Sequence, residues 1–235
     1  MQHEPDEFQE IRDAVRQLCR QFPDEYFREV DAQRAYPEAF VDALIAAGWL
    51  AAMIPEEYGG TGLGLAAASV IMEEINRAGG NAGAVHGQMY NMGTLLRSGS
   101  AAQKQKYLPD IAAGRLRIQA MAVTEPTTGT DTTKIKTTAV RKDGRWVVNG
   151  QKVWISRVQH SDLMILLART TPLPEVRRKS EGLSVFIVDL HQAVGRGLEV
   201  RPIRNMVNHE TNELFFENLE IPDENLIGTE GQGFR

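Results

Sequence analysis

The chain has 235 residues, of which 42% are hydrophobic and 24% charged, and its formal net charge is −5 at pH 7. This composition is that of a globular protein with enough length for a substantial core, in one large or two smaller domains. The acidic balance, without a stripe of lysine and arginine, argues against nucleic-acid binding.

The single cysteine, Cys19, excludes an internal disulfide framework and a cysteine-based zinc site. His86 and His209 have no His or Cys partner at helical spacing, so we expect no metal site. No apolar run is long enough to cross a bilayer, and the acidic residues 1–7 lack the apolar segment of a signal peptide. We therefore expect a cytoplasmic protein without membrane insertion.

The first half of the chain has the apolar spacing of helices. Hydrophobic residues recur three and four positions apart at Phe8, Ile11, Val15, Leu18 and Phe22. A second helix is predicted to begin at Pro37 and to end near Gly48, where a C-cap would lie. After a glycine-rich loop over 55–64, we expect helices over 65–77, 82–98 and 101–113, with Gly114 ending the series.

The hydrophobic period changes after Leu116. Strands are predicted over 118–124, 135–141, 146–149, 152–156, 163–168, 183–188, 198–201 and 213–219. The pairs Asp143-Gly144 and Asn149-Gly150 are expected as hairpin turns. Many short strands separated by glycine and proline turns indicate a compact antiparallel barrel or sandwich.

The predicted fold class is therefore α+β. We expect an N-terminal all-helical domain over 1–117 and a β domain over 118–228. Residues 229–235 read as the lead-in to a further helical domain, so we expect the chain to be a fragment whose remainder is missing.

The stretch from Met121 to Asp131, taken with Val153–Ser156, carries the chemistry. An apolar strand runs into Thr124-Glu125-Pro126 and a loop of small hydroxyl residues, while Trp154 and Ser156 share a strand face because strand side chains alternate. Such donors and one flat aromatic ring suit a planar ligand with polar edges. From the residues alone, two structural interpretations remain open. The loop could be an ordinary proline turn without a binding role, and the indole could simply cover the core.

These residues resemble the flavin-binding segments of acyl-CoA dehydrogenases. Five further segments match the family in the same order: 55–60, 103–109, 149–155, 213–222 and 225–228. The resemblance implies an FAD site formed by Met121, Ala122, Val123, Thr124, Gly129, Thr130, Trp154, Ile155 and Ser156.

The resemblance also implies a role for each of four side chains. Thr124 would lie at the pyrimidine end of the flavin, Trp154 on its dimethylbenzene side and Ser156 at N5. Thr130 would meet the pyrophosphate region or the pantetheine arm of the substrate. Glu125, which precedes Pro126, is expected to anchor the turn.

The implied activity is α,β-dehydrogenation of an acyl-CoA thioester, as in fatty acid β-oxidation. A carboxylate removes the α-proton, and a hydride leaves the β-carbon for FAD N5. Electrons would pass to an electron-transfer flavoprotein, and the protein would form a homo-oligomer, a dimer or a tetramer. Because the family's catalytic base is a glutamate in C-terminal helices, we expect no catalytic residue before Arg235 and no activity from this fragment alone.

Departures from the family pattern bear on the substrate. Arg157-Val158 stands where Asn-Gly is frequent, and residues 208–212 replace the commoner Arg-x-Ser-x-Thr. These differences put substrate preference in question more than flavin binding. The alternatives are an oxidase or monooxygenase that passes electrons to oxygen, and a non-catalytic protein that binds flavin or an acyl thioester.

Overall fold

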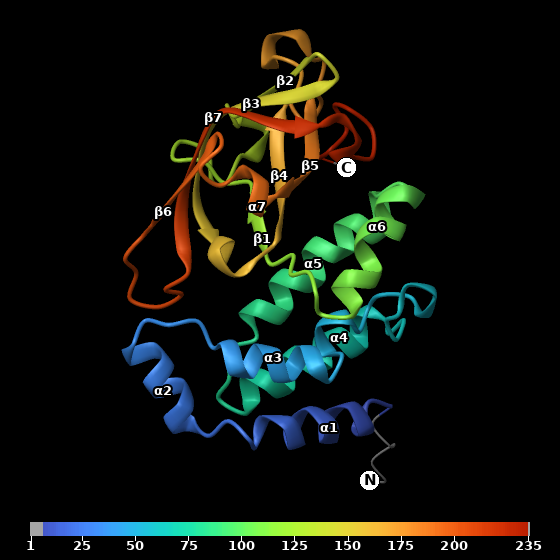
Figure 1. Cartoon of the computed structure of the whole chain (residues 1–235), viewed down its shortest axis with the longest axis vertical. Helices are drawn as coiled ribbons and strands as arrows, with labels where there is room; N and C mark the ends of the chain where they lie inside the picture. Colours follow the sequence, from blue (N-terminus) through green and yellow to red (C-terminus); the bar gives the residue numbers. More distant parts are fainter. Residues whose placement is uncertain (1–6, 235) are drawn as a thin grey trace.

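The computed structural model describes residues 7–234, with helices in the first half and strands in the second (Figure 1). The helices are α1 Gln9–Cys19, α2 Asp24–Ala32, α3 Glu38–Ala46, α4 Leu65–Arg77, α5 Gly83–Ser98, α6 Ala101–Ala112 and the short α7 Leu190–Ala193. The strands are β1 Ala120–Ala122, β2 Thr138–Lys142, β3 Arg145–Ser156, β4 Leu163–Arg169, β5 Leu183–Asp189, β6 Leu198–Pro202, β7 Thr211–Pro222 and β8 Leu226–Ile227. The predicted α+β class is confirmed.

The helical half packs around its own core. Val15, Phe40, Ile71 and Val85 are fully buried there, one from each of α1, α3, α4 and α5. Helix α2 was not predicted; it is nine residues long and buries none of its residues completely. In the described part of the chain no helix is both long and apolar enough to cross a membrane.

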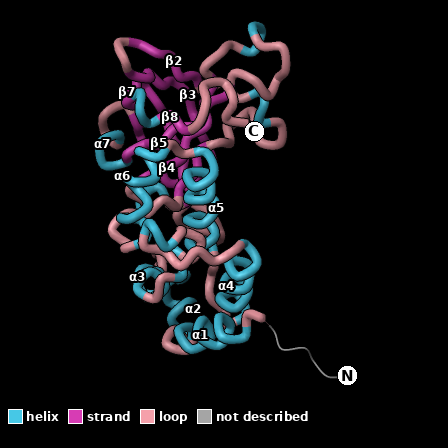
Figure 2. The backbone as a smooth tube through the Cα atoms, turned by 90° about the vertical axis from the view of Figure 1, so that its right-hand side faces the viewer, coloured by secondary structure: helices cyan, strands magenta, loops and turns pink. Residues whose placement is uncertain are grey.

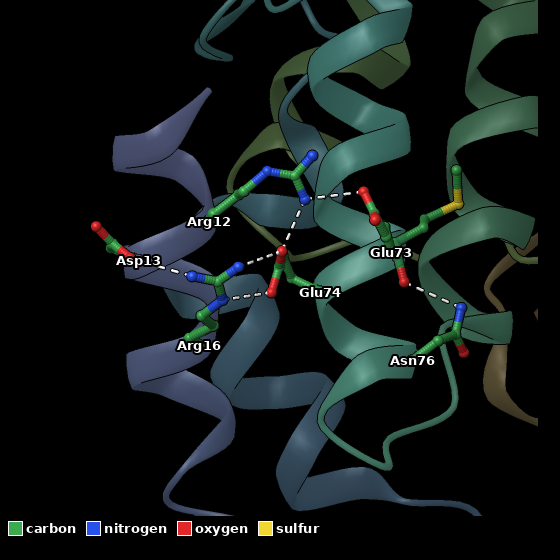
Figure 3. Close-up of polar contacts among 7 residues, drawn as sticks. Arg12, Asp13, Arg16, Glu73, Glu74 and Asn76 are labelled. Atoms are coloured by element: carbon green, nitrogen blue, oxygen red, sulfur yellow. Dashed lines mark hydrogen bonds and ion pairs between the residues drawn. The ribbon is translucent and has the colours of Figure 1, made fainter. Parts of the chain in front are cut away.

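A buried carboxylate joins the first and fourth helices. Glu74 on α4 is completely enclosed and receives hydrogen bonds from Arg16 Nε at 2.6 Å and Arg12 Nη1 at 2.7 Å, both on α1 (Figure 3). The hydrogen bond from Arg16 is the main reason why the pKa of Glu74 is lowered, against the effect of burial. This contact fastens α1 to α4.

The strands form one sheet in the order β6-β7-β3-β2-β4-β5-β8, with β1 beside β4. Most neighbours are antiparallel, but β1 and β2 both pair with β4 in parallel. Every residue of β4 is buried, because alternate side chains face two different cores. Leu166 faces the core between the strands, whereas Ile165 faces a core shared with Leu95 and Leu108 of helices α5 and α6. The sheet therefore rests on α5 and α6 (Figure 2).

One of the two predicted hairpin turns is confirmed. Asp143 and Gly144 link β2 to β3 with φ of 51° and 74°, as the favoured two-residue hairpin turn requires. The turn predicted at Asn149-Gly150 is wrong, since β3 runs unbroken from Arg145 to Ser156 with a register shift against β7 at that point. A Cβ on Gly150 would lie 2.5 Å from Thr137 Oγ1, so glycine serves a close approach of the backbone to Thr137.

Candidate functional site

The two stretches that stood out in the sequence lie side by side in the fold. The Val153 amide donates to the Thr124 carbonyl at 2.9 Å, and Lys152 Nζ donates to the Val123 carbonyl at 2.8 Å. Residues 123–137, which connect β1 to β2 and which we call the β1–β2 loop, are thus attached to the end of β3. The fold brings together the predicted loop and the predicted strand.

The β1–β2 loop begins with a tight turn. Glu125 and Thr128 exchange backbone hydrogen bonds of 3.0 Å each, with Pro126 and Thr127 at the tip. The side chain of Asp131 accepts from the backbone amide of Thr133 and starts a single turn of 3₁₀ helix over Thr132–Lys134. Pro126, Thr127, Gly129, Thr130 and Asp131 are exposed, so the tip presents small polar groups to the surface.

Glu125 anchors this loop, as expected. Its carboxylate is 5% exposed and accepts from the backbone amides of Lys136 at 2.6 Å and Thr137 at 2.8 Å, and from Lys152 Nζ at 3.0 Å. Burial alone would raise the pKa of Glu125, but the Lys152 charge and the backbone hydrogen bonds outweigh it and lower the pKa. A carboxylate committed to these partners is not available as a general base.

Two buried cationic side chains of the sheet, Lys152 and Arg169, bind the β1–β2 loop and hold it in place. Lys152 is completely buried, and burial lowers its pKa to about 8 although the Glu125 carboxylate acts in the opposite direction. The guanidinium of Arg169, at the end of β4, donates to the carbonyls of Thr133 at 2.6 Å and Ile135 at 3.3 Å. Sequence reasoning missed both cations. Their signal was a charged residue inside or directly after an apolar strand run.

The strand end next to the loop carries an unusual tryptophan. Trp154 has a positive φ of 63°, and the pairing register of β3 with β7 shifts between Lys152 and Ile155. A bulky residue seldom adopts this left-handed conformation, which costs of order 1 kcal/mol. The indole is 60% exposed, so the interpretation that it covers the core is wrong.

The predicted side chains differ in accessibility. Ser156 is half-buried, and its hydroxyl oxygen accepts from Asn208 Nδ2 at 3.0 Å, which leaves the hydroxyl proton to be donated. Met121, Val123 and Thr124 are half-buried, and Met121 borders a hollow of about 390 Å³ beside α5 and the segment after β8. Two predicted residues, Ala122 and Ile155, are enclosed in the core, so only their main chain could meet a ligand.

The surface built in this way suits a flat molecule with polar edges. It combines an exposed indole, a hydroxyl donor and a loop tip of hydroxyl and amide groups. Among residues 7–234 there is no cluster of three or more His, Cys, Asp or Glu side chains that could hold a metal ion. The exposed indole and the hydroxyl and amide donors fit a heteroaromatic ring system such as a flavin.

Comparisons with known proteins show the family of the chain. Residues 5–115 match the model of the acyl-CoA dehydrogenase N-terminal domain, and residues 120–219 match that of the middle domain. The chain belongs to the acyl-CoA dehydrogenase family.

Individual relatives support the same assignment. The chain is 33% identical over 238 residues to cyclohex-1-ene-1-carbonyl-CoA dehydrogenase of Geobacter metallireducens, covering 100% of this chain and 61% of that protein. An acyl-CoA dehydrogenase structure from Geobacillus kaustophilus shares 29% identity with a TM-score of 0.87, covering 99% of this chain and 61% of that chain.

A third match comes from work on electron transfer. A chain solved in a study of the electron transferring flavoprotein of Acidaminococcus fermentans shares 31% identity with a TM-score of 0.86, covering 100% of this chain and 61% of that chain. In all three comparisons this chain spans about three fifths of its relative's length.

Proposed function

We propose that the chain supplies the flavin-binding part of an FAD-dependent acyl-CoA dehydrogenase. The observation that carries the proposal is Trp154, an exposed indole in strained backbone beside a loop that buried charges hold in place. Conformational strain and an exposed aromatic side chain together point to a ligand contact. Family membership supports the same ligand.

Each element has a role in the proposal. The indole of Trp154 would pack on the dimethylbenzene side of the isoalloxazine, and the Ser156 hydroxyl would donate a hydrogen bond to N5. Thr124 and the loop amides face the pyrimidine end, where fixed donors stabilise the negative charge of the reduced ring. Thr130, at the exposed tip, contacts the pyrophosphate region or the pantetheine arm. The bound flavin would supply two-electron redox chemistry.

The chain's own carboxylates do not supply the base in this proposal. A general base must lie within about 3 Å of the proton that it removes, directly or through one water. Glu125, within the β1–β2 loop, is buried and bonded to Lys152 and to two backbone amides. We propose that the base comes from a part of the parent protein outside residues 1–235.

Further parts of the proposal concern the whole protein. We propose a cytoplasmic homo-oligomer, a dimer or a tetramer, that takes an acyl-CoA substrate and passes electrons to an electron-transfer flavoprotein. The match to a chain studied with the electron transferring flavoprotein of Acidaminococcus fermentans supports that acceptor.

The test uses the complete gene product. Purified protein should show the visible spectrum of bound FAD, and anaerobic addition of an acyl-CoA should bleach it. Reoxidation by an electron-transfer flavoprotein or a ferrocenium salt, faster than by oxygen, would distinguish a dehydrogenase from an oxidase. A colourless protein that takes up no FAD on reconstitution contradicts the proposal.

A further inference from the structure

Arg157 occupies a costly backbone position directly after β3. Its φ is 61°, in the left-handed region that glycine and asparagine adopt most readily. An arginine at such a position indicates that its side chain has a use.

Helix α5 makes room for the guanidinium. Gly83 and Gly87 lie one turn apart on this helix, which runs beneath β1 (Figure 1). A Cβ on Gly83 would lie 3.1 Å from Arg157 Nη1, and a Cβ on Gly87 would lie 3.0 Å from Arg157 Nη2. Glycine inside a helix costs about 1 kcal/mol relative to alanine. Because they have no side chains, the two glycines leave space for the guanidinium of Arg157 between the helix and the sheet.

The aromatic side chains around the Arg157 guanidinium carry no negative charge at pH 7. Burial raises the pKa of Tyr36 to about 12 and also raises that of Tyr90, while burial lowers the pKa of His160. All three side chains are neutral at pH 7. The Arg157 guanidinium hydrogen-bonds the Tyr90 hydroxyl and acts on Tyr36 and His160 through its charge.

Two carboxylates lie near these rings. Glu38 pairs with Arg117 at 2.6 Å, whereas Glu210 contacts Arg157 through its backbone carbonyl, which accepts from the Arg157 amide at 2.9 Å. Within residues 7–234, Arg157 makes no ion pair with a carboxylate.

Two buried donors at this place have no acceptor. Arg157 Nε is enclosed without a hydrogen-bond partner, and so is Nε2 of the fully buried Gln119. Gln119 Oε1 accepts from the Tyr36 hydroxyl at 2.7 Å, and the Gln119 carbonyl lies against Gly87 as Arg157 does. Buried donors without acceptors are costly, and an arginine fork matches a carboxylate in geometry and charge.

We propose that Arg157, assisted by Gln119, binds a second carboxylate at the end of the acyl group remote from the thioester. The preferred substrate class is then an ω-carboxyacyl thioester, the CoA ester of a short dicarboxylic acid. The inference rests on the proposed function, because Ser156 at the flavin N5 places the neighbouring Arg157 next to the acyl group.

The test compares acyl-CoA pairs of equal length that differ only in the terminal carboxylate. Flavin reduction and steady-state turnover of the complete gene product are measured with glutaryl-CoA against valeryl-CoA, and with adipoyl-CoA against hexanoyl-CoA. The wild type should favour the carboxylated member at least tenfold in kcat/KM. In Arg157→Met, kcat/KM for the carboxylated member should fall about ten- to a hundredfold, mainly through a higher KM. For the neutral member, kcat/KM should change less than threefold. Arg157→Lys should restore part of the loss.

Arg34→Met is the matched control. Arg34 is also left-handed, with φ of 54°, but it is exposed and donates only to the Asn205 carbonyl at 2.6 Å. The Arg34→Met variant should leave the ratio of kcat/KM between the carboxylated and the neutral thioester unchanged in both pairs.

The outcomes separate the two proposals. Reduction by the neutral thioesters alone, or equal losses with both members in Arg157→Met, would overturn the carboxylate site and leave the proposed dehydrogenase standing. Equal losses would indicate that Arg157 pairs with a water or with another part of the parent protein. Bound FAD that no thioester of the four reduces would overturn both.

Discussion

Among residues 7–234 each half of the molecule buries one glutamate, and the two sites differ in what the carboxylate binds. Glu74 in the helical half takes guanidinium groups from Arg12 and Arg16, which belong to a single neighbouring helix. Glu125 in the β half takes one ammonium group and two backbone amides, those of Lys136 and Thr137. The pKa of both carboxyl groups is lowered, although burial alone would raise it.

The difference shows how a buried charge can serve either the fold or a site. The Glu74 pairs connect side chains of two rigid helices, so they set how the helices pack. The Glu125 contacts reach the main chain of an irregular loop, which has no ladder of its own to fix its shape. A ring of charged and backbone groups around Glu125 therefore holds the proposed flavin loop before any ligand binds.

The largest expected effect on stability is that of removing Glu74, which pairs with Arg12 and Arg16 in the helical half. Glu74→Ala removes the anion between two arginines and should lower the free energy of unfolding by about 3 kcal/mol, measured by denaturant titration. Glu73→Ala is the control, because Glu73 pairs with Arg12 at the surface and should cost less than about 1 kcal/mol. In the folded fraction of Glu74→Ala, FAD affinity should stay within about twofold of the wild type. A large loss of affinity there would remove the distinction between the two sites.

The β-domain pair should affect both stability and binding. Lys152→Met leaves the Glu125 carboxylate buried without its counter-ion, so we expect a loss of about 2 kcal/mol in unfolding free energy and weaker FAD binding by about tenfold or more. Lys134→Met is the control on the same loop, since the Lys134–Asp131 pair of 3.1 Å is exposed. Unchanged FAD affinity in Lys152→Met would show that the loop keeps its shape without the lysine.

The contribution of Lys152 to the free energy of unfolding should depend on pH. The pKa of this lysine is about 8 in the folded protein against 10.5 for the free side chain, so between these values the unfolded chain holds a proton that the folded chain has released. The contribution of Lys152 to stability is therefore fully present above pH 10.5 and is lost as the pH falls towards 8. The difference in unfolding free energy between wild type and Lys152→Met should rise by about 3 kcal/mol across this window. A flat difference would contradict a buried, depressed Lys152.

The smallest expected effect is a gain in stability at the proposed site. Trp154→Gly relieves the left-handed backbone and removes an indole that is mostly exposed, so the unfolding free energy should rise by up to about 1 kcal/mol. FAD binding should weaken in the same variant. Thermal and denaturant unfolding of the protein without FAD check the first half of this prediction. A clear destabilisation would indicate that Trp154 packs against the fold.

Much of the fold could be predicted because periodic patterns report burial. Helices α4 and α5 and the apolar strands β4 and β5 were predicted within one or two residues at each end. Helix α2 was missed because its nine residues give the apolar pattern little length over which to repeat. The turn at Asn149-Gly150 failed because the glycine serves a tertiary approach to Thr137, which no local pattern reveals.

The candidate site could be predicted only in part. The loop and strand motifs identified the region, and the role of Glu125 as an anchor followed from its place before Pro126. The partners Lys152 and Arg169 could not be predicted, since their contacts cross between strands. The left-handed conformation of Trp154 depends on a register shift between β3 and β7, which alternation along one strand does not encode.

The central claim is that Trp154 and the charge-held loop form the flavin site. The most direct measurement is the FAD dissociation constant of the complete gene product, by flavin fluorescence, for wild type, Trp154→Ala and Val140→Ala. Val140 is a matched control, an apolar residue of the same sheet that is also about 60% exposed. We predict about tenfold or greater weakening for Trp154→Ala and none for Val140→Ala. Equal affinity in all three proteins would contradict the account.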